Sequence, residues 1–131
     1  MVIEGTVVQG KKIGRRLGFP TANVSPAERV QLPRFGVYLC LLRTQEAAYP
    51  SIANIGRHPT LPEGHITVEV HMLDAYRDLY GQAVRVELLG FLRPEQRFDN
   101  VYALKQQIQR DAEAAKAYFE HRMPEGASMQ W

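Results

Sequence analysis

The sequence has few of the features that place a protein in a specialised class. It contains a single cysteine, Cys40, so no disulfide can form within the chain. No apolar stretch approaches the ~20 residues that a membrane-spanning helix needs. The first residues lack the charged start and the apolar core of a signal peptide. We therefore expect no membrane partner and, by default, a cytoplasmic location.

The numbers of positive and negative side chains are also nearly equal. Lys and Arg number 16 and Asp and Glu number 14, which gives a formal net charge of +2. That balance is too small to argue for a nucleic-acid partner. The histidines and the cysteine show no clustered spacing, so no zinc site is predicted. Cys40 stands in the apolar run 37–42, which indicates a buried small residue and not a nucleophile.

The length and composition are those of an ordinary globular protein. A chain of 131 residues with 45% hydrophobic and 23% charged residues fits one domain. Such a domain buries roughly two-thirds of its unfolded surface and needs no disulfide or metal to fold. Internal repeats and low-complexity segments are absent from the sequence. We expect a single domain over residues 1–131.

The first three-quarters of the chain predicts short strands. Runs rich in Val, Ile, Leu and Tyr are separated by turn residues. Pro20 disfavours a helical conformation at Phe19 and so predicts one further extended segment. The expected strands are 2–8, 35–43, 48–55, 66–74 and 83–92, with the further segment around 20–24.

The last quarter predicts one amphipathic helix over about 100–122. Apolar residues recur there every three or four positions, from Val101 to Phe119. Asp99 is the predicted N-cap, and residues 123–131 are expected to form a loosely ordered tail. Many short strands followed by one such helix favour a closed or nearly closed antiparallel barrel with the helix packed outside.

A glycine-rich basic segment follows the first strand. Residues 10–18 combine three glycines with four basic side chains. Glycines let backbone N–H groups turn toward an anion, and cationic side chains favour a polyphosphate. A solvated basic hairpin is equally consistent with these residues. The segment is not a Walker A loop, because no helix is predicted after it.

Thr21 and Asn23 form the first candidate site. In an extended segment they point the same way, and a hydroxyl and an amide carbonyl are neutral oxygen ligands that suit Mg²⁺. The alternative is a turn in which Asn23 bonds its own backbone. The spacing alone favours that alternative.

Glu69 is the second candidate. Alternation along residues 66–74 places apolar side chains on one face and polar ones on the other. The apolar set is Val68, Val70 and Met72, and the polar set is Thr67, Glu69 and His71. A mid-strand carboxylate can act as a general base where partial burial tunes its pKa. A solvent-facing polar stripe is the more common arrangement of such residues.

The link between the last strand and the helix holds the third candidate. Arg93 and Phe98 can flank a planar aromatic ligand by stacking. They can equally cap the end of the barrel, with Arg93 paired to Glu95.

Together these segments resemble the riboflavin kinase family. The sequence Gly-Phe-Pro-Thr-Ala-Asn at 18–23 is a specific signature, and further matches follow in the family's order between residues 2 and 111. The matching stretches are 5–10, 14–23, 36–38, 53–56 with 59–60, 69–71, 78–81, and 92–95 with 98.

The resemblance implies a six-stranded antiparallel Greek-key barrel with a C-terminal helix. It implies phosphorylation of riboflavin by ATP at the ribityl 5′-hydroxyl, giving FMN and ADP, with a divalent metal that is usually Mg²⁺. In bacteria this module is usually the C-terminal half of a bifunctional FAD synthetase. The adenylyltransferase half is missing from this sequence, so we expect a stand-alone kinase or an excised module that makes FMN and not FAD.

The resemblance also implies roles for individual residues. Glu69 would be the catalytic base, and Thr21 and Asn23 would hold the metal. The residues at the nucleotide would be Gly10, Arg15, Gly18, Thr21, Met72, Asp74 and Tyr80. The residues at the flavin would be Arg93, Gln96 and Phe98.

Two other functions compete with this one. A non-catalytic flavin-binding or regulatory barrel would need no base, and the intact Thr21, Asn23 and Glu69 argue against it. A barrel that binds nucleic acid would interleave aromatic with basic strand residues. Here Tyr38 and Phe91 lie among apolar neighbours, which indicates core residues, so we expect riboflavin and ATP as partners and no nucleic acid.

Overall fold

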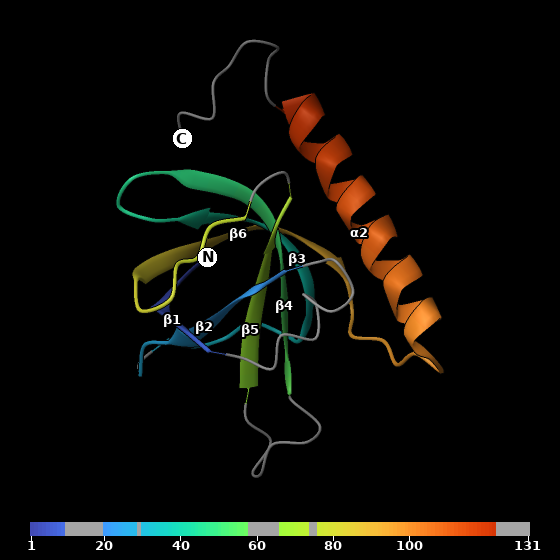
Figure 1. Ribbon diagram of the computed structural model, residues 1–131, viewed down its shortest axis with the longest axis horizontal. Coiled ribbons are helices and arrows are strands. Elements are labelled where there is room, and N and C mark those ends of the chain that lie inside the picture. The colour runs from blue at the N-terminus through green and yellow to red at the C-terminus, as the bar shows by residue number, and fades with distance from the viewer. Residues whose placement is uncertain (10–19, 29, 58–65, 74–75, 123–131) are drawn as a thin grey trace.

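The structure, a computed structural model, describes residues 1–9, 20–28, 30–57, 66–73 and 76–122. Within these ranges the chain forms six strands and one helix (Figure 1). The elements are β1 (Val2–Val8), β2 (Ala22–Pro26), β3 (Gly36–Arg43), β4 (Ala48–Arg57), β5 (Ile66–Met72), β6 (Ala83–Arg93) and α2 (Val101–Arg122). Both the number and the order of the elements agree with the prediction.

The strands close into an antiparallel barrel in the order β1-β2-β5-β4-β3-β6. β3, β4 and β5 are consecutive neighbours, and β6 returns to lie beside β3, which is a Greek-key arrangement. Closure leaves no strand edge unpaired. The predicted six-stranded Greek-key barrel is therefore confirmed, and so is the helix on its outside.

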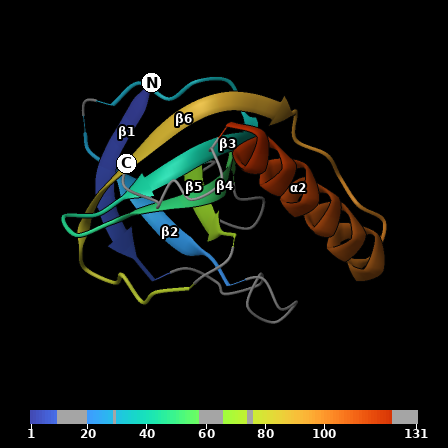
Figure 2. The same ribbon diagram turned by 90° about the horizontal axis from the view of Figure 1, so that it is seen from above.

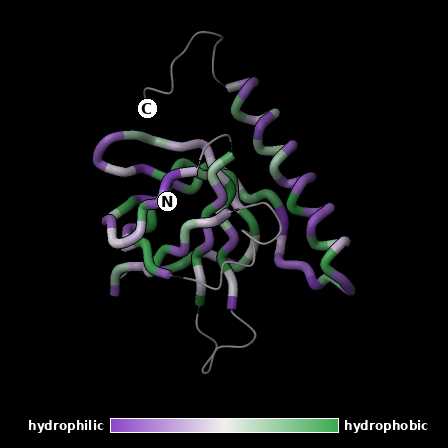
Figure 3. The backbone as a smooth tube through the Cα atoms, viewed as in Figure 1, coloured by the Kyte–Doolittle hydropathy of each residue, from purple (hydrophilic) through white to green (hydrophobic). Residues whose placement is uncertain are grey.

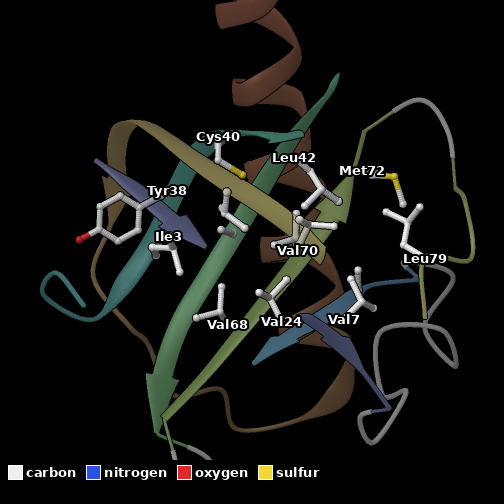
Figure 4. Close-up of a cluster of buried hydrophobic side chains, with 14 of the residues drawn as sticks. Ile3, Val7, Val24, Tyr38, Cys40, Leu42, Val68, Val70, Met72 and Leu79 are labelled. Atoms are coloured by element: carbon white, nitrogen blue, oxygen red, sulfur yellow. The ribbon is translucent and has the colours of Figure 1, made fainter. Parts of the chain in front are cut away.

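Apolar side chains fill the barrel. Alternate residues of every strand point inward, and those in Figure 4 converge on one cluster. Cys40 is fully buried there, and desolvation raises the pKa of its thiol above the ordinary value. The prediction that Cys40 is a core residue is confirmed.

A second apolar cluster lies between the barrel and the helix. Val37 and Leu39 of β3 pack there with Ile52 of β4 and Ala115 of α2. Figures 1 and 2 show α2 lying along the outside of the barrel, with its C-terminal half against the strands. β3 is therefore buried on both faces, which explains its almost continuous apolar sequence. In Figure 3, hydrophobic segments gather in the barrel, whereas hydrophobic and hydrophilic residues alternate along the helix.

The helix begins at Val101, whereas an N-cap at Asp99 would start it at residue 100. The Oδ1 atom of Asn100 accepts a hydrogen bond from the Ala103 N–H at 2.8 Å, and the Asn100 carbonyl accepts from the Leu104 N–H. These are the two bonds of an N-cap residue, so the assignment of Asp99 as N-cap was wrong. Both residues are suitable caps, and only the helical phase decides between them.

The first turns of α2 extend past the barrel (Figures 1 and 2). Val101 is 63% exposed and Tyr102 is 72% exposed, whereas Ala115 is fully buried. The N-terminal part of the helix therefore leaves apolar surface uncovered beside the link 94–100. No helix in the described ranges is long and apolar enough to cross a membrane.

The cap assignment predicts a difference between two neighbouring substitutions. Asn100→Ala should lower the free energy of unfolding by about 1 kcal/mol, because it removes the acceptor for the Ala103 N–H. Asp99→Ala is the matched control and should cost less than about 0.5 kcal/mol. Urea titration followed by circular dichroism measures both. A larger loss for Asp99→Ala would contradict the assignment.

Candidate active site

A row of polar side chains crosses the outside of the barrel. Asn23 of β2 pairs with Glu69 of β5, and Glu69 pairs in turn with Asn54 of β4. The strand neighbours of Glu69, Val68 and Val70, are buried inside the barrel, so alternation directs the row outward. Directly paired residues have Cβ atoms ~5 Å apart. Glu69 therefore lies between two residues that carry carboxamide groups.

Thr21 and His71 continue this surface toward the start of β2. Thr21 immediately precedes β2 and lies one residue beyond the last ladder pair, Ala22 with Val70. His71 follows Val70 on β5, and its Nδ1 atom lies 3.1 Å from the Pro20 carbonyl oxygen. Burial and the positive charge of Lys116 lower the pKa of His71, and the bond to Pro20 opposes that shift. The structure thus brings Asn23 beside Glu69 and places Thr21 just past the end of the same ladder.

A pocket opens next to Thr21 and Asn23. Its walls also include Gln9, at the end of β1, and Asp78 and Tyr80 from the segment before β6. The Tyr80 N–H donates to Asp78 Oδ1 at 3.1 Å, which fixes the turn there, and the Tyr80 side chain is exposed. The predicted nucleotide residues Thr21 and Tyr80 therefore share one pocket.

The remaining predicted nucleotide residues are placed differently. The Met72 side chain is buried inside the barrel, as Figure 4 shows, so a nucleotide can meet this residue only through its backbone. Gly10, Arg15, Gly18 and Asp74 lie outside the described residues.

Arg93 is bound to the helix. Its Nε donates to Asp111 Oδ1 at 2.9 Å and its Nη2 to Asp111 Oδ2 at 2.8 Å, which is a bidentate ion pair. Gln107 Nε2 also donates to Asp111 Oδ1, at 3.0 Å. The Asp111 side chain is only 6% exposed. The alternative pairing of Arg93 with Glu95 was therefore wrong, and the Glu95 carboxylate lies against Gly56 instead.

Sequence reasoning missed Asp111. A signal was present, because Asp111 falls on the apolar stripe of the helix, three residues after Ile108 and four before Ala115. A carboxylate on a buried stripe needs a partner. The sequence offers several arginines, and only the fold selects Arg93.

Two of the predicted flavin residues, Arg93 and Phe98, lie near each other. The Arg93 guanidinium carbon is 5.9 Å from the centre of the Phe98 ring, and Phe98 is half-buried while Gln96 is exposed. Arg93 also pairs with Val37 of β3, which is beside the strand of Asn54. Glu69 and Arg93 are thus three strand spacings apart across the same outer surface, at most ~14 Å.

The donor set near Glu69 suits a hard cation. Thr21 and Asn23 supply neutral oxygens, and Mg²⁺ prefers few protein ligands together with phosphate oxygens and water. In the described part of the chain, no three His, Cys, Asp or Glu residues are grouped as a metal site. A cation held by Thr21 and Asn23 would therefore take phosphate oxygens or water as its other ligands.

A family model matches most of the chain. The model described as "Flavokinase: Riboflavin kinase" covers residues 1–119. The chain therefore belongs to the riboflavin kinase family.

Known proteins agree with this assignment. The bifunctional riboflavin kinase/FMN adenylyltransferase of Escherichia coli K12 is 45% identical over 89% of this chain. This chain spans 37% of the length of that relative. The RNA-binding riboflavin kinase RibR of Bacillus subtilis is 38% identical over 91% of this chain and 51% of its own length.

Two solved structures share the fold. A structure of riboflavin kinase from Trypanosoma brucei superposes with a TM-score of 0.67 at 28% identity, over 91% of this chain and 79% of that chain. A structure titled macrolide-efflux protein from Streptococcus pneumoniae superposes with a TM-score of 0.80 at 33% identity, over 88% of this chain and 38% of that chain.

The ion pair between Arg93 and Asp111 predicts strong coupling. Arg93→Met or Asp111→Leu alone should destabilise the fold by about 3–5 kcal/mol, because each leaves one largely buried charge without its partner. The double variant should cost clearly less than the sum of the two losses. Urea unfolding of the four proteins gives the coupling energy. Simple additivity would show that the pair does not hold the helix.

Proposed function

We propose that this chain transfers the γ-phosphate of ATP to the ribityl 5′-hydroxyl of riboflavin, giving FMN and ADP. The observation that carries the proposal is the pairing of Asn23 with Glu69, with Thr21 two residues before Asn23. This pairing supports a site in which a carboxylate lies beside a carboxamide, with a hydroxyl two residues away. Membership of the riboflavin kinase family supports the identity of both substrates.

Glu69 acts as the general base in the proposed reaction. Its carboxylate takes the proton of the 5′-hydroxyl as that oxygen attacks the γ-phosphorus. A new oxygen–phosphorus bond forms, and the bond from the γ-phosphorus to the bridging oxygen breaks, so ADP leaves with the electron pair. Transfer of this kind depends on positioning and charge stabilisation more than on covalent chemistry.

Thr21 and Asn23 would hold the divalent cation, which is Mg²⁺ in our proposal. When bound, such an ion offsets the negative charge on the phosphate oxygens. The pocket that Thr21 and Asn23 share with Tyr80 supports placing the nucleotide on this side of Glu69. The Met72 backbone, Gly10, Arg15, Gly18 and Asp74 complete the proposed nucleotide site.

The flavin lies on the other side of Glu69, against the link and the helix. Phe98 offers a ring for stacking, and Gln96 offers an amide. Arg93 is occupied by Asp111, so we propose that it shapes the flavin site by holding the helix in place. The ribityl chain then runs across the strands from Phe98 toward Glu69.

Further partners follow from the relatives. We propose that this chain works beside an adenylyltransferase domain, as in the bifunctional relative. We propose no nucleic-acid partner for this chain, although one relative is named as RNA-binding. A measurement of salt-dependent binding to single-stranded RNA tests this part of the proposal directly. The cytoplasmic location stays a prediction.

Glu69→Gln tests the reaction. Turnover should fall ~10²–10⁴-fold, the usual contribution of a general base, while riboflavin affinity changes little. Incubation with ATP, Mg²⁺ and riboflavin, followed by chromatography that separates FMN from FAD, measures the rate and identifies the product. Glu4→Gln, an exposed carboxylate on β1, is the control and should keep wild-type turnover. Full activity of Glu69→Gln would refute the base assignment.

Removing the oxygen donors tests the metal site. Thr21→Val and Asn23→Ala should each raise the Mg²⁺ concentration that gives half-maximal activity by roughly tenfold, which corresponds to the loss of one favourable contact of ~1.4 kcal/mol. Asn54→Ala, on the opposite side of Glu69, should leave the Mg²⁺ requirement unchanged. A Mg²⁺ titration of initial rates checks all three. Equal effects of the three substitutions would argue against a metal at Thr21 and Asn23.

A further inference from the structure

His71 is a half-buried side chain beside the site that the proposed mechanism does not use. It lies two residues after Glu69 on the same face of β5. Its Nδ1 atom lies 3.1 Å from the Pro20 carbonyl oxygen, across 51 positions of sequence. The contact therefore ties the strand of the proposed base to the segment that carries the proposed metal ligands.

The chemistry of this contact fixes a proton on one ring nitrogen. A carbonyl oxygen only accepts hydrogen bonds, so Nδ1 must carry the proton and donate it. The neutral ring is then the tautomer with its proton on Nδ1. Burial and the nearby charge of Lys116 lower the pKa of His71 and favour that neutral form, while the bond to Pro20 opposes this shift.

The acceptor lies immediately before Thr21. The carbonyl of Pro20 belongs to the peptide unit that joins Pro20 to Thr21, and the Cα of Thr21 lies in the plane of that unit. The backbone ladder between β2 and β5 has its last pair at Ala22 and Val70. The His71 side chain thus extends the pairing past the end of the ladder to the residue next to Thr21.

We propose that His71 is a positioning residue, which holds the Pro20–Thr21 peptide so that the Thr21 hydroxyl lies in place for the metal and nucleotide. The inference rests on the proposed function, because it gives His71 a role in the same site. His71 touches neither the reacting oxygen nor the phosphorus in this scheme. Its effect reaches the reaction through Thr21.

The strand offers a matched control. Thr67 lies two residues before Glu69 on the same face, and its hydroxyl donates to the Gly56 carbonyl at 3.3 Å. It makes the same class of contact as His71, a side chain bonded to a neighbouring backbone carbonyl. Its contact is to β4, however, and not to the segment before β2.

Four proteins test the inference: wild type, His71→Leu, His71→Asn and Thr67→Val. His71→Leu removes the donor, and His71→Asn returns a donor near the position of Nδ1. Calorimetric titration with Mg²⁺–ADP in the absence of riboflavin measures nucleotide binding, and initial rates give KM for MgATP. Riboflavin affinity is followed by flavin fluorescence.

We expect His71→Leu to weaken Mg²⁺–ADP binding roughly 3- to 10-fold, the worth of one hydrogen bond, and to raise KM for MgATP by a similar factor. Riboflavin affinity should stay unchanged. His71→Asn should recover most of the loss, and Thr67→Val should bind Mg²⁺–ADP as the wild type does. In the wild type, ¹⁵N NMR should show the proton of His71 on Nδ1.

Three results would overturn the inference. They are unchanged Mg²⁺–ADP binding in His71→Leu, no recovery in His71→Asn, and an equal loss in Thr67→Val, which would indicate general weakening of β5. Failure of the proposed function looks different, because the wild type would then form no FMN. An active wild type with an unaffected His71→Leu variant refutes the role of His71 alone.

Discussion

The register between β2 and β5 is the constraint on which the candidate site depends. Ala22 pairs with Val70 and Asn23 pairs with Glu69. Because side chains alternate along a strand, a slip of one residue would turn Glu69 into the apolar interior. An unpaired carboxylate there is costly, and Val68 and Val70 would lose their burial. The same apolar packing that stabilises the barrel therefore fixes the carboxylate and the amide on its outer face.

In the barrel, the residues that stabilise the fold differ from those proposed to carry out the reaction. Its interior is filled by one apolar cluster, and the polar row of Asn23, Glu69 and Asn54 lies on the outside. Closure gives the outer residues a fixed frame, because every strand is paired on both sides. Residues from distant parts of the chain, such as Asn23, Glu69 and Arg93, then occupy defined places on one surface. A rigid frame of this kind suits a reaction that depends on positioning.

The helix completes that surface from one side. Its C-terminal half is anchored by the second apolar cluster, and its middle by the ion pair of Asp111 with Arg93. Its first turns extend past the barrel and leave Val101 and Tyr102 exposed near Phe98. The ion pair thus determines how far the link and the helix stand from the strands. In our proposal this distance sets the width of the flavin site.

The sequence predicts most of the fold, because the signals are local. The alternation in β5 and the helical period of α2 both follow from neighbouring residues, so the elements were placed to within a few positions. The N-cap was missed because Asp99 and Asn100 are equally good N-cap residues, and only the position at which the helix starts decides between them.

Contacts between distant segments could not be predicted from the sequence. The partner of Arg93, the bond from His71 to Pro20 and the placement of Asn54 beside Glu69 all depend on strand order and register. No local pattern specifies these. The convergence of Thr21, Asn23 and Glu69 was expected only through the family resemblance, and their individual roles stay predictions.

A crystal structure of the complex with Mg²⁺, riboflavin and a non-hydrolysable ATP analogue tests the central claim most directly. The account predicts a cation about 2.1 Å from the side-chain oxygens of Thr21 and Asn23, with the ribityl 5′-oxygen within ~2.6–3.2 Å of the Glu69 carboxylate. A cation bound elsewhere, or a 5′-hydroxyl on a face of the barrel that Glu69 cannot reach, would contradict it.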